Sequence, residues 1–266
     1  MVSINPLKRK KTMKKYIFMA VAGMLALSSC SNDDNDVQNA PRQMTFTAGF
    51  GDEAQTRATL DGKKVSFDAN DEISILSANN TNTKFTTTAG GASATFTGTA
   101  TADSKFYAVY PYTNGLALSG TTITGVIIPK SQNDAATSTC GWDPAAPIAY
   151  ATTTGTSLQF HNACALLKIN NDRGNAMDIS VSCNEALTGK FSLDTSSGTL
   201  SDSETNKIAS AGSVPSGKTI YIAIAPGEKT SFSANWEDMD NIVMKQKTSV
   251  TFEAGKIYDL GNTSKW

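Results

Sequence analysis

The 266-residue sequence has one histidine and four cysteines, and these shortages exclude several classes of catalytic site. A zinc site needs several histidine or cysteine ligands at short spacing, and no such cluster occurs. A Ser-His-Asp triad has only His161 to draw on, and no Gly-x-Ser-x-Gly elbow is present. The sequence also lacks the glycine-rich motifs that bind phosphates or dinucleotides. We therefore predict that the protein is not an enzyme and needs no cofactor and no metal.

An excess of basic residues is also missing. Residues 1–29 hold six Lys or Arg and no acidic residue, so the 237 residues that follow carry 17 basic and 24 acidic side chains. Proteins bind nucleic acids mainly through basic side chains that displace counterions from the phosphates. We therefore expect no nucleic-acid partner. After residue 29, no apolar run is long enough to cross a bilayer.

The N-terminal segment has the pattern of a secretory signal peptide. Lys14 and Lys15 precede an apolar run at residues 17–27, which is short for a membrane-spanning helix. A core helix or a plain membrane anchor is the alternative. The run ends in LSSC, which resembles the lipobox of bacterial lipoproteins. The resemblance implies that residues 1–29 are removed and that Cys30 is acylated, which anchors the chain without a spanning helix.

The residues after Cys30, SNDDND, are acidic and polar. Such a run is typical of a solvated, disordered tether. It also resembles the acidic export signal that follows the lipidated cysteine in surface lipoproteins of the Bacteroidales. We predict a lipidated tether at residues 30–42 and a surface-exposed position on the cell outer membrane.

The rest of the chain alternates apolar and polar residues at a period of two. MTFTAGF places Met44, Phe46, Ala48 and Phe50 on one face, and runs such as TITGVIIP and KTIYIAIAPG continue the pattern. No segment after the signal shows a sustained helical stripe. Short strands at this spacing are typical of antiparallel β-sandwiches. A loop-rich TTTGT precedes a long apolar run near Ser157, so we expect an all-β fold with two sandwich domains, at residues 43–157 and 158–266.

Three cysteines, Cys140, Cys164 and Cys183, remain after Cys30. An odd number leaves at least one free thiol in an oxidising compartment. Cys164 and Cys183 lie on strand-like runs separated by NNDRGN, and a hairpin there would set them opposite each other. A disulfide between them is one alternative, although spacing alone does not fix cysteine geometry.

Four further features each have a structural and a functional interpretation. The acidic residues 68–72, DANDE, form either a solvated turn or a weak Ca²⁺ site that lacks the spacing of an EF-hand. The aromatic residues 106–112, FYAVYPY, either fill the core or line a sugar-binding surface that includes Tyr112. Trp142 either plugs the end of a sandwich or is an exposed contact residue. We favour the structural interpretation of each, and we expect His161 to pack or hydrogen-bond at a strand edge.

Six segments occur in the same order as in one known family. They are QTRATLDGKKVSFDANDEISI, FYAVYPY, WDPAAPIAYA, LQFHNACALLKI, YIAIAPG and FEAGKIYDLG, of which FHNACALLKI and AGKIYDL are the most specific. Together they cover nearly all of the mature chain and resemble the fimbrillin family of Bacteroidales surface lipoproteins. Phe67 and Asn70-Asp71 stand where that family often has Trp and Gly-Asp. The resemblance implies two transthyretin-like Greek-key β-sandwich domains.

The resemblance also implies a mechanism of assembly. An extracellular trypsin-like protease cuts after an arginine and frees the first strand, and a strand from another fimbrillin subunit fills the groove by β-augmentation. Arg57 follows the first strand in a polar segment, where proteolysis is favoured, and is the candidate cleavage site. An ordinary loop arginine is the alternative. Arg42 precedes the strand, so a cut there would leave the strand in place.

The candidate donor strand lies in SVTFEAGKIYDLGNTSKW, with Val250, Phe252, Ile257 and Leu260 as its apolar positions. Little chain follows Leu260. If the final strand is needed to complete its own domain, the protein cannot donate it freely. The molecule would then be a cap, an anchor or a non-polymerising relative.

These features favour a structural or accessory subunit of a cell-surface fimbria. The alternative is a monomeric surface lipoprotein whose loops bind a glycan or a protein on a host or bacterial surface. A hydrolase ranks last because no pair of carboxylates stands out, although such a pair need only be close in space. Stalk, tip and anchor roles all stay open.

Overall fold

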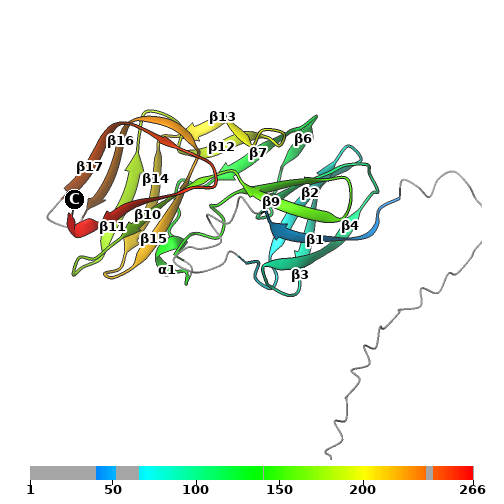
Figure 1. Ribbon diagram of the computed structural model, residues 1–266, viewed down its shortest axis with the longest axis horizontal. Coiled ribbons are helices and arrows are strands. Elements are labelled where there is room, and N and C mark those ends of the chain that lie inside the picture. The colour runs from blue at the N-terminus through cyan, green and yellow to red at the C-terminus, as the bar shows by residue number, and fades with distance from the viewer. Residues whose placement is uncertain (1–39, 52–65, 140, 238–241, 266) are drawn as a thin grey trace, which may run out of the picture. The chain divides into compact units, whose positions relative to one another are not determined.

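A computed structural model of the chain describes residues 40–51, 66–139, 141–237 and 242–265, and nearly all regular structure there is β-strand (Figure 1). The single α-helix of these residues is α1 (Asp134–Thr137), and a 3-10 turn, η3 (Thr263–Lys265), follows the last strand. No helix in these ranges has the length and apolar character to span a membrane. The all-β class predicted from the alternation is confirmed.

Seven strands close into a barrel in the order β1-β4-β3-β2-β5-β8-β9. They are β1 (Arg42–Phe50), β2 (Glu72–Ser77), β3 (Asn80–Thr87), β4 (Ser93–Ala100), β5 (Phe106–Tyr110), β8 (Ala149–Thr153) and β9 (Ser157–Asn162). The sheet closes because β1 pairs antiparallel with β4 and parallel with β9. Alternation of apolar and polar residues shows only that one face of a strand is buried. Strands of an open sandwich sheet and strands of a closed barrel both have one buried face, so the pattern does not distinguish the two.

The other strands form three sheets, in the orders β15-β10-β18, β14-β11-β16-β17 and β13-β12-β7-β6. Their bounds are β6 (Ala117–Ser119), β7 (Thr122–Ile128), β10 (Ala165–Asn170), β11 (Met177–Ser182), β12 (Thr188–Asp194), β13 (Thr199–Asn206), β14 (Ile208–Val214), β15 (Thr219–Ile224), β16 (Gly227–Glu237), β17 (Ile242–Phe252) and β18 (Ile257–Asn262). One apolar cluster contains Ile169 and Ile222 from the first sheet and Ile179 and Trp236 from the second. These two sheets therefore pack as a β-sandwich.

Strand pairing joins residues on the two sides of Ser157. β7 pairs with β12, and β9 belongs to the barrel. A second apolar cluster combines Leu76 and Val109 from barrel strands with Ile123 and Phe191 from β7 and β12. The division into domains at residue 157 stays a prediction.

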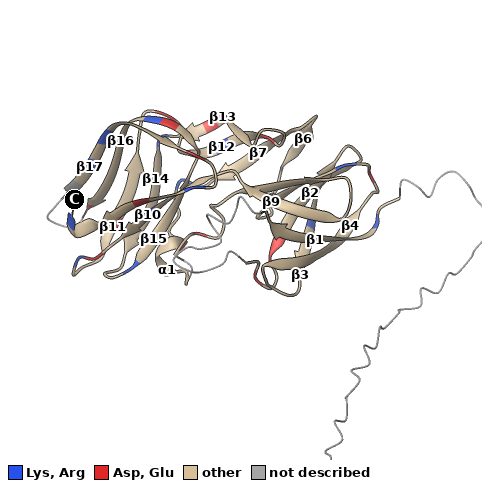
Figure 2. Ribbon diagram, viewed as in Figure 1, with Lys and Arg blue, Asp and Glu red and all other residues tan. Residues whose placement is uncertain are grey.

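β5 is buried on both of its faces. Phe106 and Ala108 point into the barrel core, as the alternation predicts, whereas Tyr107 and Val109 belong to the second cluster. Basic and acidic side chains are interspersed over the described strands (Figure 2). This distribution agrees with the absence of a basic excess in the sequence.

A segment before the sandwich covers the edges of β14 and β15. Gln132 donates its backbone N–H to Ser210 O at 2.7 Å, and Tyr221 donates its N–H to Gly141 O at 2.8 Å. The fully buried Gln132 side chain donates to Ala223 O at 2.7 Å and accepts the Ala223 N–H at 2.8 Å. One side chain thus takes the place of a neighbouring strand at Ala223.

This pairing predicts that Gln132→Ala destabilises the fold. The substitution leaves a buried N–H and a buried carbonyl of Ala223 without partners, so we expect a loss of about 1–3 kcal/mol in the free energy of unfolding. Urea denaturation followed by circular dichroism measures this. Gln246→Ala, at an exposed position of β17, is the matched control and should change stability by less than about 0.5 kcal/mol. Equal effects of the two substitutions would contradict the role given to Gln132.

Candidate functional site

The first strand, β1, contributes its inner face to the core of the barrel. Phe46 and Ala48 are fully buried, and Met44 and Phe50 are partly buried against the same cluster. The outward-facing Thr45 and Thr47 are exposed. The face predicted from MTFTAGF is therefore the face that the structure buries. Phe46 packs edge-on against Phe85 and Phe106, with ring centroids 5.4 and 5.2 Å apart.

The backbone of β1 pairs with β4 along most of its length and with β9 over its last four residues. Its pairing with β4 runs from Arg42, opposite Ala100, to Gly49, opposite Ser93. On the other edge, Thr47 N–H donates to Thr156 O at 2.8 Å, and Gly51 N–H donates to Phe160 O at 3.1 Å. Removal of β1 would leave unpaired N–H and C=O groups along β4 and β9, which is the arrangement that an added strand can satisfy.

Phe50, the last residue of β1, sits among three aromatic rings. It stacks on Phe67 at 5.1 Å between centroids, and it lies 6.3 Å from Tyr110 and 6.0 Å from Phe160. We call Phe67, Tyr110 and Phe160 the aromatic cage. Phe50 and Phe67 lie on either side of residues 52–65 in the sequence, so their contact brings the described parts of the chain before and after that segment together. A cut within it would break the covalent link between β1 and the rest of the barrel.

The proposed cleavage site Arg57 and the proposed lipidation site Cys30 both lie outside the described residues. Their roles stay predictions. The stacking of Phe67 on Phe50 was not anticipated from the sequence. A signal was present, since Phe67 is the first large aromatic residue after the polar segment that follows β1.

Residues 68–71 form a turn that leads into β2, which begins at Glu72. Asn70 has a φ of 72°, and the Asp71 carboxylate accepts the Asp68 N–H at 2.9 Å and the Tyr110 hydroxyl at 3.0 Å. Partial burial raises the pKa of Asp71 above its ordinary value of 3.8. Glu72 forms an ion pair with Lys84 at 2.9 Å. Among the residues that the structure describes, no three His, Cys, Asp or Glu side chains are grouped to hold a metal ion.

The four candidate donor residues lie in the chain's own sheets. Val250 and Phe252 end β17, which pairs with β16, and Ile257 and Leu260 belong to β18, which pairs parallel with β10. Phe252 is 2% exposed and contacts the rings of Phe232 and Tyr258. The final strand therefore completes the sandwich of its own chain. The donor role stays a prediction.

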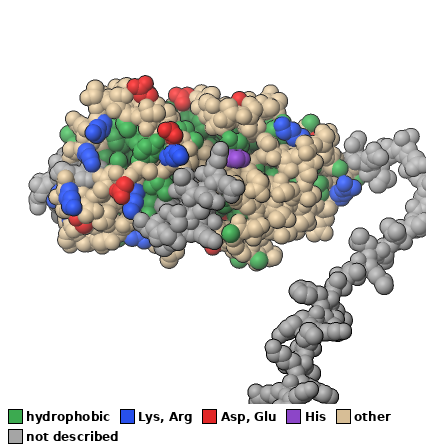
Figure 3. All heavy atoms as spheres, viewed as in Figure 1, with side chains coloured by type: hydrophobic (Ala, Val, Ile, Leu, Met, Phe, Trp, Pro, Cys, Tyr) green, Lys and Arg blue, Asp and Glu red, His purple; other side chains and the backbone are tan. Residues whose placement is uncertain are grey.

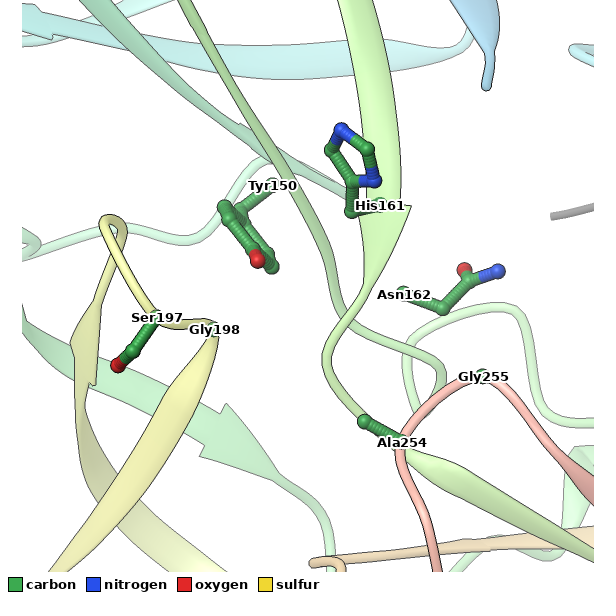
Figure 4. Close-up of a pocket in the computed structure, with 7 residues that line it drawn as sticks. All are labelled: Tyr150, His161, Asn162, Ser197, Gly198, Ala254 and Gly255. Carbon is green, nitrogen blue, oxygen red and sulfur yellow. The ribbon is translucent and has the colours of Figure 1, made fainter. Parts of the chain in front are cut away.

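The single histidine lines a small pocket of about 190 Å³ (Figure 4). Its lining also includes Tyr150, Asn162, Ser197 and the turn at residues 254–255. In Figure 4 the Asn162 amide and the Ser197 hydroxyl point away from the Tyr150 ring. The His161 side chain reaches the surface and lies 5.9 Å from the Tyr150 ring (Figure 3). Among the described residues that line this pocket there is no carboxylate.

The aromatic residues considered as exposed contacts are both partly buried. Trp142 packs edge-on against Tyr221 with centroids 6.2 Å apart and forms an isolated parallel bridge with it. Tyr112 carries the Lys84 ammonium over its ring, 4.5 Å from the centroid. Both arrangements agree with a packing role. Pro111 directly follows the last residue of β5.

The disulfide considered between Cys164 and Cys183 is wrong. Both residues are buried, free thiols. The strands next to them, β10 and β11, do not form a hairpin but belong to different sheets, so the two cysteines lie in different apolar clusters. Burial raises the pKa of the Cys183 thiol.

The sequence matches no model of a protein family and no curated protein. Two solved structures share the fold, and both are described as candidate cell adhesion proteins. The one from Bacteroides uniformis is 17% identical with a TM-score of 0.54, covering 84% of this chain and 93% of its own. The one from Bacteroides ovatus is 15% identical with a TM-score of 0.53, covering 84% and 92%. A fimbrial protein from Bacteroides vulgatus also aligns, at 12% identity over 83% of this chain and 95% of its own. Its TM-score of 0.31 is too low to establish a shared fold.

The raised pKa of Asp71 predicts a pH-dependent effect of Asp71→Asn. A raised folded-state pKa means that the wild-type chain loses stability as pH rises through that pKa. Asparagine keeps an acceptor for Tyr110 but cannot ionise. The stability of the variant relative to wild type should therefore increase from about pH 3 to about pH 7. Urea denaturation at both pH values measures the difference, and a constant or falling difference would contradict the prediction.

Proposed function

We propose that this chain is a structural or accessory subunit of a cell-surface fimbria, exported as a lipoprotein and assembled by protease-triggered strand exchange. The observation that carries the proposal is the place of β1. This strand joins β4 and β9, buries an aromatic face, and connects to the rest of the barrel only through the segment that contains Arg57. In this proposal the protein is not an enzyme, and its partners are other subunits and an extracellular trypsin-like protease.

Cleavage matters because it changes the effective concentration of β1. While the chain is intact, β1 is tethered next to its groove, and an outside strand competes poorly against a tethered one. After a cut at Arg57, β1 is held by non-covalent contacts alone. Burial of a phenylalanine such as Phe46 contributes about 1.5–3 kcal/mol. A free strand of matching pattern can then displace it, and the lipid on Cys30 leaves with the removed piece.

The acceptor and donor roles have different energetic costs. Accepting a strand requires only that the cut peptide leaves. Donating one requires Phe252 to leave the sandwich core and β18 to leave β10. An uncut chain is therefore expected to stay monomeric, and the first exchange should use the chain as an acceptor.

The alternative is a monomeric lipoprotein that binds a glycan or a host protein. It has less support because Trp142 and Tyr112, its proposed contact residues, pack against Tyr221 and Lys84.

Substitution of the proposed cleavage site tests the assembly proposal. We expect an arginine-specific protease to convert the wild-type chain to a form that starts at Ala58 and then to SDS-resistant oligomers. Arg57→Gln should stay uncut at this position and monomeric. Arg42→Gln, on the other side of β1, is the matched control and should assemble like the wild type. N-terminal sequencing detects the cut, and unboiled SDS gels detect the oligomers. A cleanly cut chain that stays monomeric would contradict the proposal.

A further inference from the structure

The pocket beside His161 is built from three parts of the chain that are far apart in the sequence. They contribute Tyr150, His161 and Asn162 from β8 and β9, Ser197 and Gly198 from the turn between β12 and β13, and residues 254–255 from the turn before β18. Figure 4 shows these parts on different sides of one space. Small-molecule sites are concave and commonly lie where separate parts of a fold meet, so this pocket has the position of a ligand site.

Backbone hydrogen bonds fix the two turns that close the pocket. Gly198 N–H donates to Asp194 O at 2.8 Å, and Gly255 N–H donates to Cys164 O at 2.8 Å. Gly198 has a φ of 74°, and a side chain at this position would collide with the Tyr150 hydroxyl. Glycine is therefore needed here both for the backbone conformation and for the close approach of Tyr150. The pocket is formed before any ligand arrives.

Tyr150 and His161 form an aromatic wall on one side of the pocket. They lie directly opposite each other on β8 and β9, so their side chains share one face of the sheet. Their ring centroids are 5.9 Å apart with a tilt of 39°. Among the described residues, none hydrogen-bonds to the exposed His161 imidazole. In its neutral form this ring offers a ligand one donor and one acceptor.

The walls opposite the two rings are made by small residues. Ser197, Gly198, Ala254 and Gly255 leave a volume of about 190 Å³. Pockets for drug-sized ligands measure about 300–1,000 Å³, so this space is smaller than theirs. It suits a group of the size of a single sugar ring, with one apolar face toward the aromatic wall.

The described lining of the pocket carries no charged side chain. Carboxylates and phosphates are recognised mainly by Arg or Lys, and a cationic ligand needs a carboxylate, so an ionic ligand would lose its hydration here without a charged partner. Imidazole, amide and hydroxyl groups exchange hydrogen bonds with uncharged hydroxyl groups. The chemistry of the lining therefore favours a neutral ligand that is rich in hydroxyl groups.

The barrel surface next to His161 is uncharged as well. The outward positions of β9, β1 and β4 are exposed and include Ser157, Gln159, Thr45, Thr47, Thr95 and Thr97. In Figure 3 the barrel surface beside the histidine is mostly tan, the colour of neither charged nor hydrophobic side chains. A longer neutral chain of sugars that leaves the pocket can lie over this face without burying a charge.

We propose that this pocket binds one pyranose unit of a neutral glycan, which packs on the Tyr150 ring and exchanges hydrogen bonds with His161. The site is separate from Trp142 and Tyr112. It also goes beyond the proposed function, because binding needs only the ends of β8 and β9 and the two turns, and no strand has to leave the fold. A fimbrial subunit with this pocket would hold a sugar as well as its neighbouring subunits.

A screen with defined sugars tests the class of ligand. The full chain is exposed to polyacrylamide conjugates that each carry glucose, galactose, mannose, fucose, N-acetylglucosamine or N-acetylgalactosamine, and to conjugates of N-acetylneuraminic acid and glucuronic acid. Biolayer interferometry measures binding, and the free methyl glycoside serves as competitor. We expect at least one neutral conjugate to bind and neither acidic conjugate to do so. Failure of all the neutral conjugates, or binding of the acidic ones alone, would overturn the proposal.

Three variants test the place of the ligand. H161A removes a hydrogen-bonding group from an exposed position and should weaken binding about 2- to 10-fold. A254F, at an exposed turn position, fills the pocket with a ring and should weaken binding about tenfold or more. Q159A, at the preceding outward position of β9, is the matched control and should change binding by less than about twofold.

Circular dichroism confirms that each variant is folded before binding is measured. H161A keeps the test decisive if A254F does not fold, because His161 lies at the surface. Binding by H161A or by folded A254F that equals the wild type would place the sugar elsewhere and overturn the site.

Discussion

The structure depends on the pairing of one strand with two partners that are far apart in the sequence. β1 joins β4 on one edge and β9 on the other, and its inner face carries Phe46 into the middle of the barrel core. A closed sheet has no free edge, so loss of this strand exposes two edges and an apolar groove together. The cost of an empty groove is what would drive a second strand into it. In the proposed mechanism, the same contacts that stabilise the intact chain would therefore provide the free energy for assembly after a cut.

β9 and β10 follow each other in the chain. They connect β1, the strand proposed to leave, with the C-terminal region proposed to be donated. β1 pairs parallel with β9, and β18 pairs parallel with β10. The turn before β18 is held where these two strands meet, since Gly255 N–H donates to Cys164 O. The strand proposed to leave and the segment proposed to be donated are thus supported by neighbouring parts of one backbone. A change at this junction would therefore affect both ends of the proposed exchange.

The local pattern of the sequence correctly predicted which face of a strand is buried, but it did not predict which strands pair with each other. MTFTAGF predicted which side of β1 is buried because alternation is set by the backbone itself. The closure of the barrel depends on pairing between residue 47 and residue 157, and no local pattern encodes that contact. The disulfide alternative fails for the same reason, since it needs a hairpin at NNDRGN, whereas β10 and β11 enter different sheets. The cage around Phe50 likewise needs Phe67, Tyr110 and Phe160 from three separate segments.

The remaining edges of the sandwich are protected in ways that direct exchange toward the barrel. Gln132 and its neighbours cover β14 and β15 on one side. On the other side, β17 carries the exposed Lys245 and Lys247, and the Lys245 ammonium donates to Leu260 O of β18 at 3.1 Å. Lysines on an edge strand oppose pairing with another chain, because a second strand would have to displace or bury their charges. The groove that β1 fills is covered by β1 itself. In the proposed mechanism, cleavage would remove this strand and leave its groove open to another one, so assembly would wait for a protease.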